Sequence, residues 1–442
     1  MLRKSLGWAS LLFITAAAVF AHGELPSAGP LVRRSGRTAS AAQRAVEAAR
    51  IREADIRFYQ ARVARDPYGA RDRAALGALY LARGRATGDA NDFVRAESLA
   101  TASLVTRHRR NAAAAQVLVS ALMAEHRFAR AWAVMVPEVE ADPEDMVARA
   151  TLGEIALELG RYAAADSLFG SLAVVRTSPA VAPRYARWLE LNGKSGEARE
   201  LLIATRRELE NGFRVPEEQL AWFDLRIGEL AFRNGRPDLA QAAYDRGLAI
   251  LAGDPRLLAA KARLEAARND WHAAIQLGEQ SLGVTLDPAT LGLLSDAYAA
   301  LGDNDKAEEY ARAMEVSVSG QPGAYHRGWA LFLLDHQRRV RQVLREAQAE
   351  LETRKDVYGY DVLAWALHQS GRDREALPVA DTALSRGTRD AMLHYHRGLI
   401  ALALADTLQA RADLSRALEI NPGYAPEHGR PARVVLSSLD RR

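Results

Sequence analysis

The chain has 442 residues, of which 49% are hydrophobic, and its 59 lysines and arginines nearly balance its 55 aspartates and glutamates, giving a formal charge of +4. It contains no cysteine, which excludes disulfides, thiol nucleophiles and thiolate metal sites. The small net charge favours neither the presence nor the absence of a nucleic-acid partner. Abundant alanine and leucine with only 16 prolines favour a helical fold.

The N-terminus carries the pattern of a secretory signal. Arg3 and Lys4 precede an apolar run, Leu6–Ala21, that is short for a membrane span and ends in VFA, which suits a signal peptidase. We therefore predict a cleaved signal peptide over residues 1–21 and export to a periplasm or the medium, with an uncleaved anchor as the alternative. Residues 22–40 are rich in Gly, Pro, Ser and Arg, which predicts a flexible linker.

From residue 70 onward the sequence repeats one pattern with a period of about 34 residues. A small residue, or valine in one unit, opens the second helix of each predicted helix pair. These residues are Ala96, Ala131, Ala165, Ala198, Ala240, Ala274, Ala307, Val340, Ala376 and Ala410. Eight of the nine gaps between them are 33 to 36 residues, and the gap from Ala198 to Ala240 is 42. This spacing predicts an array of repeated units.

Each unit has the same internal order. Its first helix carries an aliphatic residue followed by a small one, as in Leu152-Gly153, which lets the two helices of a pair approach closely. A turn follows that often contains glycine, as at Gly160, because glycine accepts a positive φ. Many units end in Asp-Pro or Asn-Pro, as at Asp142-Pro143, where we expect proline to end the second helix.

These features resemble the tetratricopeptide repeat, whose pattern is Leu-Gly in the first helix, then Gly-x-Tyr, Ala-x-x-x-Phe and Pro. The stretch LGEIALELGRYAAADSLF matches this pattern at Leu152, Gly153, Gly160, Tyr162, Ala165 and Phe169. A second good match, RGLIALALADTLQARADLSRALEINP, ends at Pro422. The resemblance extends from Arg71 to Tyr424. It implies an all-α fold, a right-handed α-solenoid of about ten tetratricopeptide-like helix pairs.

Departures from the pattern suggest where the chain divides. Residues 41–69 resemble a second helix without its first, which predicts an N-terminal capping half-repeat, because the ends of an array must be shielded from water. Residues 70–205 are predicted to form a subarray of about four repeats, and residues 220–425 another of about six. The 42-residue gap predicts a connecting segment at 206–219. Residues 426–442 are predicted to be a tail with a short capping helix.

No motif in the chain indicates catalysis. The sequence contains no G-x-S-x-G, G-x-x-x-x-G-K-[ST], G-x-G-x-x-G or H-E-x-x-H, and its glycines fall at repeat positions. His394 and His396 flank Tyr395, but residues two apart on a helix point to different faces, which disfavours a shared metal ion. We therefore predict no catalytic residue, no metal site and no cofactor.

Large side chains recur on the first helices of the last three repeats. Tyr325, Trp329 and Phe332 are spaced i, i+4 and i+7, and so share one helix face. The resemblance implies that this face lines the concave surface of the superhelix. The candidate partner-binding residues are Tyr325, Trp329, Phe332, Trp365, His368, Tyr395 and Leu399. The alternative interpretation is that these side chains form the core between repeats.

The array accounts for nearly the whole chain, so a binding function is predicted. The expected function is an exported, non-enzymatic scaffold that holds a protein or peptide partner in its concave groove. Two alternatives stay open: a cell-envelope assembly or structural protein held by an uncleaved N-terminal anchor, and the substrate-docking arm of an enzyme complex. No nucleic acid is expected, because the N-terminus indicates export. Self-association also stays open.

Overall fold

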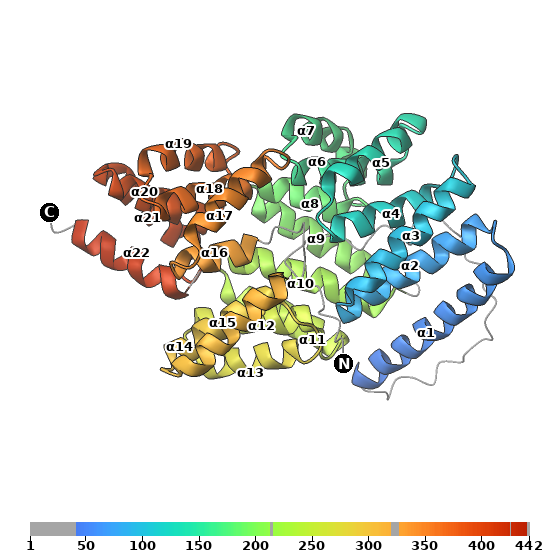
Figure 1. Cartoon of the computed structure of the whole chain (residues 1–442), viewed down its shortest axis with the longest axis horizontal. Helices are drawn as coiled ribbons and strands as arrows, with labels where there is room; N and C mark the ends of the chain where they lie inside the picture. Colours follow the sequence, from blue (N-terminus) through green and yellow to red (C-terminus); the bar gives the residue numbers. More distant parts are fainter. Residues whose placement is uncertain (1–40, 213–214, 320–326, 425, 440–442) are drawn as a thin grey trace.

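The structure of the chain is a computed structural model that describes residues 41–212, 215–319, 327–424 and 426–439. The predicted signal peptide, the predicted linker and the candidate binding residue Tyr325 lie outside the described residues. Within the described ranges the chain forms 22 α-helices and no β-strand (Figure 1). The predicted all-α solenoid is thereby confirmed.

Twenty of these helices form ten consecutive helix pairs. In chain order the pairs are α2 (Ala70–Thr87) with α3 (Ala90–Thr106), α4 (Ala112–Ala124) with α5 (Phe128–Ala141), α6 (Met146–Glu158) with α7 (Tyr162–Ser171), α8 (Ala182–Leu191) with α9 (Ser195–Glu210), α10 (Glu217–Arg233) with α11 (Pro237–Ile250), α12 (Pro255–Ala267) with α13 (Trp271–Leu282), α14 (Pro288–Ala300) with α15 (Asn304–Ser319), α16 (Arg327–Asp335) with α17 (Val340–Leu351), α18 (Val357–Gln369) with α19 (Asp373–Leu384), and α20 (Ala391–Ala403) with α21 (Thr407–Ile420). The helix α1 (Ala41–Arg65) precedes the pairs, α22 (Pro426–Leu439) follows them, and the short 3-10 helix η2 (Ala173–Val175) follows α7.

The predicted small residues form the contact between the two helices of a pair. Eight of the ten are fully buried: Ala96, Ala131, Ala165, Ala198, Ala240, Ala274, Ala376 and Ala410. Ala307 is only partly buried. Val340 was the wrong choice, because it is partly buried while Val343, one turn later, is fully buried. Two residues in the left-handed conformation, Gln337 and Arg339, lengthen the turn before α17. The buried position of α17 therefore falls later in the sequence than the repeat pattern predicts.

Asp-Pro sequences begin a first helix at two places, whereas Asp142-Pro143 directly follows the last residue of α5. Asp254 caps α12 by accepting hydrogen bonds from the backbone N–H groups of the second and third helical residues, and Pro255 is the first residue of that helix. Asp287 and Pro288 take the same places in α14. Proline suits this position because the first N–H groups of a helix have no partner within the helix. The expectation that proline ends the preceding helix is therefore wrong at Pro255 and Pro288, whereas α5 does end directly before Asp142-Pro143.

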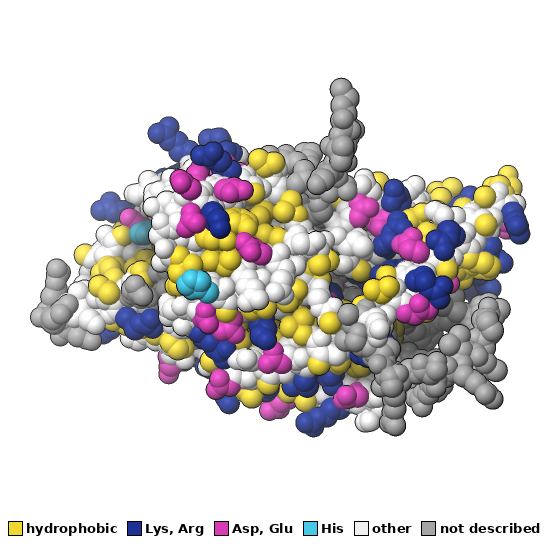
Figure 2. Space-filling view, turned by 90° about the horizontal axis from the view of Figure 1, so that it is seen from below, with side chains coloured by type: hydrophobic (Ala, Val, Ile, Leu, Met, Phe, Trp, Pro, Cys, Tyr) yellow, Lys and Arg dark blue, Asp and Glu magenta, His cyan; other side chains and the backbone are white. Residues whose placement is uncertain are grey.

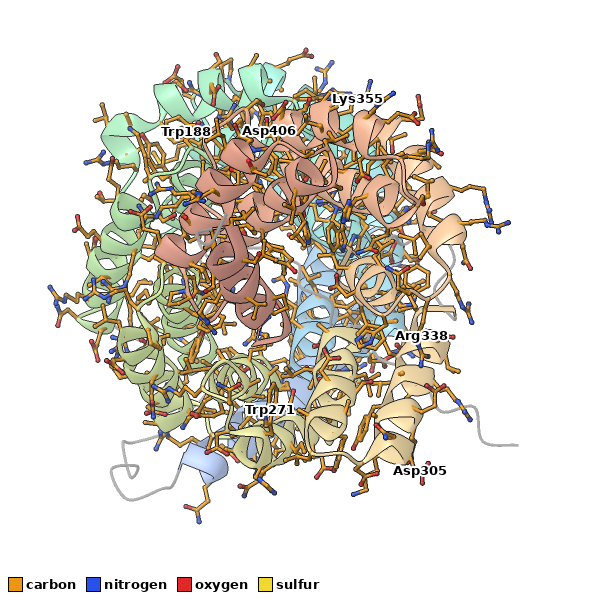
Figure 3. The ribbon with its side chains drawn as sticks, turned by 90° about the vertical axis from the view of Figure 1, so that its left-hand side faces the viewer. Trp188, Trp271, Asp305, Arg338, Lys355 and Asp406 are labelled. Atoms are coloured by element: carbon orange, nitrogen blue, oxygen red, sulfur yellow. The ribbon has the colours of Figure 1, made fainter. Side chains whose placement is uncertain are left out.

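The superhelix closes on itself along one line of contacts, which we call the seam. The C-terminal end of α6 contacts the loop before α18, the end of α8 contacts the loop before α20, and the end of α10 contacts the loop before α22. In each case the two contacting segments are six repeats apart in the chain. Several hydrogen bonds cross the seam. Among them, Lys355 N donates to Leu159 O (3.2 Å), Thr388 Oγ1 to Leu191 O (2.6 Å), and Asn421 Nδ2 to Phe232 O (2.8 Å). Carbonyl groups at a helix end lack a partner in the regular ladder, and the seam supplies one. Viewed from the side in Figure 3, the helices form a ring.

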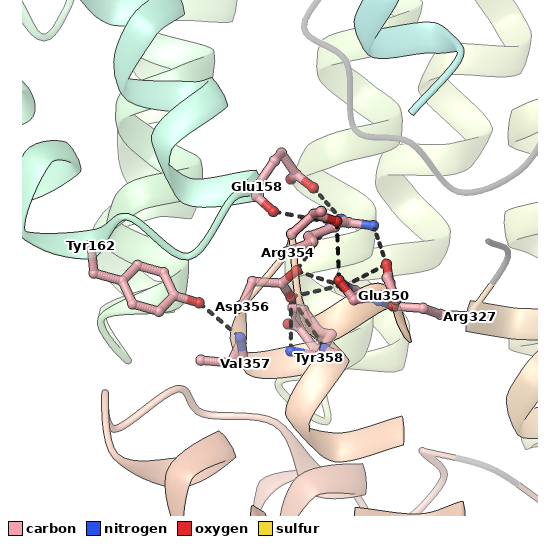
Figure 4. A network of polar contacts seen from close by, with 10 residues as sticks. Glu158, Tyr162, Arg327, Glu350, Arg354, Asp356, Val357 and Tyr358 are labelled. Atoms are coloured by element: carbon pink, nitrogen blue, oxygen red, sulfur yellow. Dashed lines mark hydrogen bonds and ion pairs between the residues drawn. The ribbon is translucent and has the colours of Figure 1, made fainter. Parts of the chain in front are cut away.

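Charged residues hold the seam where α6 meets α18 (Figure 4). Arg354 forms an ion pair with Glu158 at the end of α6, and its Nε lies 3.0 Å from an oxygen of Asp356, the residue that caps α18. Arg327 also binds Asp356, at 2.6 Å. Burial favours the neutral form of Asp356, but Arg327 and Arg354 outweigh it and hold the pKa of this carboxyl below its usual value. The seam is therefore tied by ionised groups.

Candidate functional site

The predicted aromatic residues lie in the core of the last repeats. Trp329, Phe332, Trp365 and Tyr395 are between 3% and 8% exposed and belong to one hydrophobic cluster. Leu399 packs against this cluster, and His368 is partly buried. The alternative interpretation, that these side chains form the core between repeats, agrees with their burial. Their contact with a partner stays a prediction.

Trp365 shows how completely this region is packed. Its indole Nε1 donates to Asp335 at 2.8 Å, and its ring stacks on His396 with 4.3 Å between the centroids. Trp329 and Trp365 do not occupy equivalent places in their repeats, although both lie on first helices. The left-handed turn residues Gln337 and Gly371 are 34 positions apart, so Trp365 corresponds to position 331 and not to Trp329.

The outer surface offers no dominant charged patch on the face that Figure 2 shows, where basic and acidic side chains are interspersed. The inner surface differs, because first helices from separate repeats bring arginines together there. We call Arg85 on α2, Arg184 on α8 and Arg256 on α12 the inner arginine cluster. Arg184 is 2% exposed and its Nε donates to Glu154 of α6 at 2.9 Å. Arg256 pairs with Asp254 at 2.6 Å.

Arg85 is the member of the cluster without a matching carboxylate. Its Nη2 is buried and has no hydrogen-bond partner. Burial lowers the pKa of Arg85 to about 10, with the charges of Arg256 and Arg184 acting in the same direction and Glu154 opposing them. Arg85 therefore lies within the electrostatic influence of Arg184, Arg256 and Glu154 but forms no ion pair of its own with the described residues. A bound carboxylate or phosphate would complete the pairing, since guanidinium groups bind both with two parallel hydrogen bonds.

A second charged layer joins α8, α10 and α12. Glu190 accepts hydrogen bonds from Arg187 (2.9 Å), Arg226 (3.2 Å) and Arg233 (2.6 Å). Burial raises the pKa of Glu190, but the three arginines outweigh burial and the net shift is downward. Glu229 is bound by Arg226 at 2.6 Å. Because three arginines share the one carboxylate of Glu190, this layer contains more arginines than the carboxylate can neutralise.

The sequence analysis did not predict this second charged layer, although a local sequence pattern marks it. The spacing Arg-x-x-Glu occurs at Arg187 and Glu190 in α8 and again at Arg226 and Glu229 in α10. Residues three apart share a helix face, so the pattern predicts a charged stripe on consecutive first helices. Nothing equally local marks Arg85, whose neighbours Arg184 and Arg256 lie far along the chain.

The part of the chain that the structure describes also bears on metal binding and on membrane insertion. No group of three or more histidine, aspartate or glutamate residues there is arranged to hold a metal ion. No described helix combines the length and the apolar character needed to cross a bilayer.

Comparison with known proteins supports the repeat assignment. The family model of the tetratricopeptide repeat matches residues 288–313, which span α14 and most of α15. A search of curated protein sequences finds no match. The chain is similar to the solved structure of a tetratricopeptide repeat protein from Parabacteroides merdae, at 18% identity over 59% of this chain and 97% of that chain, with a TM-score of 0.35. It is also similar to the Cut9–Hcn1 hetero-tetramer of the APC/C, at 12% identity over 90% of this chain and 95% of that chain, with a TM-score of 0.34.

The local architecture agrees with that family match along the array. Ten helix pairs follow one another, and small buried residues join the helices of most pairs. Close approach is visible at Gly228, where an added Cβ would overlap the ring of Tyr244 on the second helix. Residues 288–313 thus match the tetratricopeptide repeat, and the ten helix pairs share its architecture of two antiparallel helices per repeat.

Proposed function

We propose that this chain is an exported, non-enzymatic scaffold that binds a segment of a protein partner along its inner surface. The repeat architecture supports the scaffold role, because stacked helix pairs create an extended surface for binding. The pattern in residues 1–21 supports export.

The observation that carries the proposal is the unpaired guanidinium nitrogen of Arg85. A buried donor without a partner costs roughly 1–3 kcal/mol, and more when the group is charged. An anionic side chain of the partner would remove that cost by binding between Arg85, Arg184 and Arg256. The inner arginine cluster therefore favours an acidic segment over a basic or purely apolar one.

The geometry of the ring favours a partner segment in extended form. Arg85, Arg184 and Arg256 belong to the first, fourth and sixth helix pairs, yet the charges of the other two act on Arg85 inside the ring. This proximity of separate repeats favours an extended segment over a folded domain as the partner. The seam restricts the interior further by joining helix pairs that an open superhelix would hold apart.

Substitution of Arg85 by glutamate tests the proposal. The Arg85→Glu variant reverses the charge that would bind the partner, so we expect it to lose the protein captured from an extract of the native host. The new carboxylate lies near Arg184 and Arg256, which favours correct folding. Circular dichroism and the thermal midpoint check the fold, and mass spectrometry quantifies the captured protein.

The matched control is Arg345→Glu, which makes the same charge change at an exposed position on α17. We expect this variant to capture the partner as the unmodified chain does. Equal capture by the unmodified chain and by Arg85→Glu would contradict binding at the inner surface. Loss of capture in both variants would contradict it too, because a nonspecific charge effect would then explain the result.

A further inference from the structure

A pocket of about 200 Å³ lies across the seam, between α10–α12 and the start of α20. Its apolar wall includes Phe232, Tyr244 and Met392, and its polar wall includes Arg263, Asp390 and Tyr424. The two halves come from repeats that are far apart in the chain, so the pocket exists only while the superhelix is closed. Drug-sized ligands occupy pockets of about 300–1,000 Å³, so this one suits a smaller molecule.

Two charged groups in the pocket have hydrogen-bonding capacity to spare. Arg263 makes one long contact, 3.4 Å to Glu229, and an arginine has five N–H donors. Asp390 uses Oδ1 to accept the backbone N–H of Met392 at 2.9 Å, which caps α20. No hydrogen bond is made by its Oδ2. The pocket therefore offers a cationic donor and an anionic acceptor to a ligand.

A third polar group lies beside them. The hydroxyl of Tyr424 is buried and has no hydrogen-bond partner. Burial raises the pKa of Tyr424 well above its usual value and so keeps the hydroxyl protonated, as a donor. Burial also raises the pKa of Asp390, while the charge of Arg233 opposes that shift. A cationic ligand group near Asp390 would stabilise the ionised carboxylate.

The charge of the pocket selects among ligand classes. Arg233 and Arg263 balance Glu229 and Asp390, so the lining is neutral overall. Arg233 is bound to Glu190 and Glu229 is bound to Arg226, each at 2.6 Å. The balance leaves one positive group, Arg263, and one negative group, Asp390, for a ligand. A small zwitterion matches this pair better than an anion or a cation does.

We propose that the pocket binds a free α-amino acid, with its carboxylate at Arg263 and Tyr424, its ammonium group at Asp390 and an apolar side chain against Phe232 and Met392. The ligand would touch both sides of the seam, so binding would stabilise the closed superhelix. This site is separate from the inner arginine cluster and does not depend on the protein partner. A peptide terminus carries either the ammonium group or the carboxylate, but not both on one residue. The site would therefore bind a free amino acid more tightly than a peptide terminus.

Titration calorimetry of the full chain with single amino acids tests the proposal. We expect an apolar or aromatic amino acid to bind and to raise the thermal midpoint, because a ligand that binds only the folded state stabilises it. The N-acetylated and the carboxamide forms of the same amino acid should each bind at least about tenfold more weakly, since each lacks one charged contact. Equal binding of either derivative would overturn the proposal in favour of a peptide end.

Two variants locate the site. Asp390→Asn keeps a residue that caps helices well and removes the charge, so we expect a loss of amino-acid affinity of at least about tenfold with little change in folding. The control is Asp406→Asn at the exposed cap of α21, which should leave the affinity unchanged. Tyr424→Phe should weaken binding without altering the fold. Absence of binding by all amino acids, or equal affinity in Asp390→Asn and the unmodified chain, would overturn the proposal.

Discussion

Single arginines perform different tasks in this chain according to the carboxylates around them. Arg386 crosses the seam and donates to Asp166 (2.7 Å) and to the side chain of Asn192 (2.6 Å). Arg85 is buried in part and keeps one nitrogen without a partner. Arg386 ties distant repeats together although its Nε also has no hydrogen-bond partner, whereas Arg85 forms no ion pair with the described residues. Residue type alone does not separate these tasks, because the distinction depends on which helices meet.

His336 provides a pH-dependent contact between neighbouring repeats. Its Nε2 lies 2.8 Å from Asp296 of α14. The hydrogen bond with Asp296 raises the pKa of His336 above 6.5, burial and Arg338 oppose this shift, and Asp335 adds to it. A raised pKa in the folded state means that this contact stabilises the fold fully below pH 6.5 and loses its effect as pH rises through the folded pKa.

Replacement of this histidine measures that contribution. We expect His336→Gln to reduce the free energy of unfolding at about pH 5.5 and to have a smaller effect at about pH 8.5, where the native histidine is neutral. Urea unfolding at the two pH values gives the difference. An effect of equal size at both would show that the histidine acts through packing and not through its charge.

At the scale of the helix, the repeat pattern predicted more about the fold than about the site. The spacing of small residues located ten second helices, because each pair needs one close contact. The aromatic side chains were harder to interpret, because the central first helices are buried on nearly all sides. In α6, every residue from Ala150 to Leu157 is buried. A helix without an exposed face gives no sequence signal for which side meets a ligand.

Gly160 tests the contact between a helix end and the seam. Its φ of +71° is strained for other residues, and an added Cβ would overlap the carbonyl oxygen of Lys355. Gly371 has φ +72° with no atom within 4 Å of the added Cβ, so Gly371→Ala isolates the backbone cost of about 1–2 kcal/mol. We expect Gly160→Ala to reduce the free energy of unfolding by more than this control does. Equal losses in urea unfolding would show that the seam is loose at this position.

At the scale of the whole molecule, the decisive feature is closure. Thr388 and Leu191 meet although they are 197 residues apart, and Val357 meets Tyr162 across 195. A repeat period fixes how neighbouring pairs stack, but closure depends on small rotations that add up over six pairs. No local pattern records their sum, so neither the seam nor the inner arginine cluster was predictable from the repeat. Closure is also the reason for which we propose an extended partner segment.

Cross-linking across the seam tests closure most directly, because the native chain has no cysteine and any cysteine cross-link must come from introduced residues. Asp166, which is exposed, and Arg386, which is partly buried, form an ion pair of 2.7 Å between α7 and the loop before α20. The Asp166→Cys/Arg386→Cys double variant would be treated with a short bismaleimide, with each single variant and the urea-unfolded chain as controls. A closed superhelix predicts an efficient cross-link within one chain that urea abolishes. Full labelling of both cysteines without an internal cross-link would contradict closure, and with it the proposed inner binding surface.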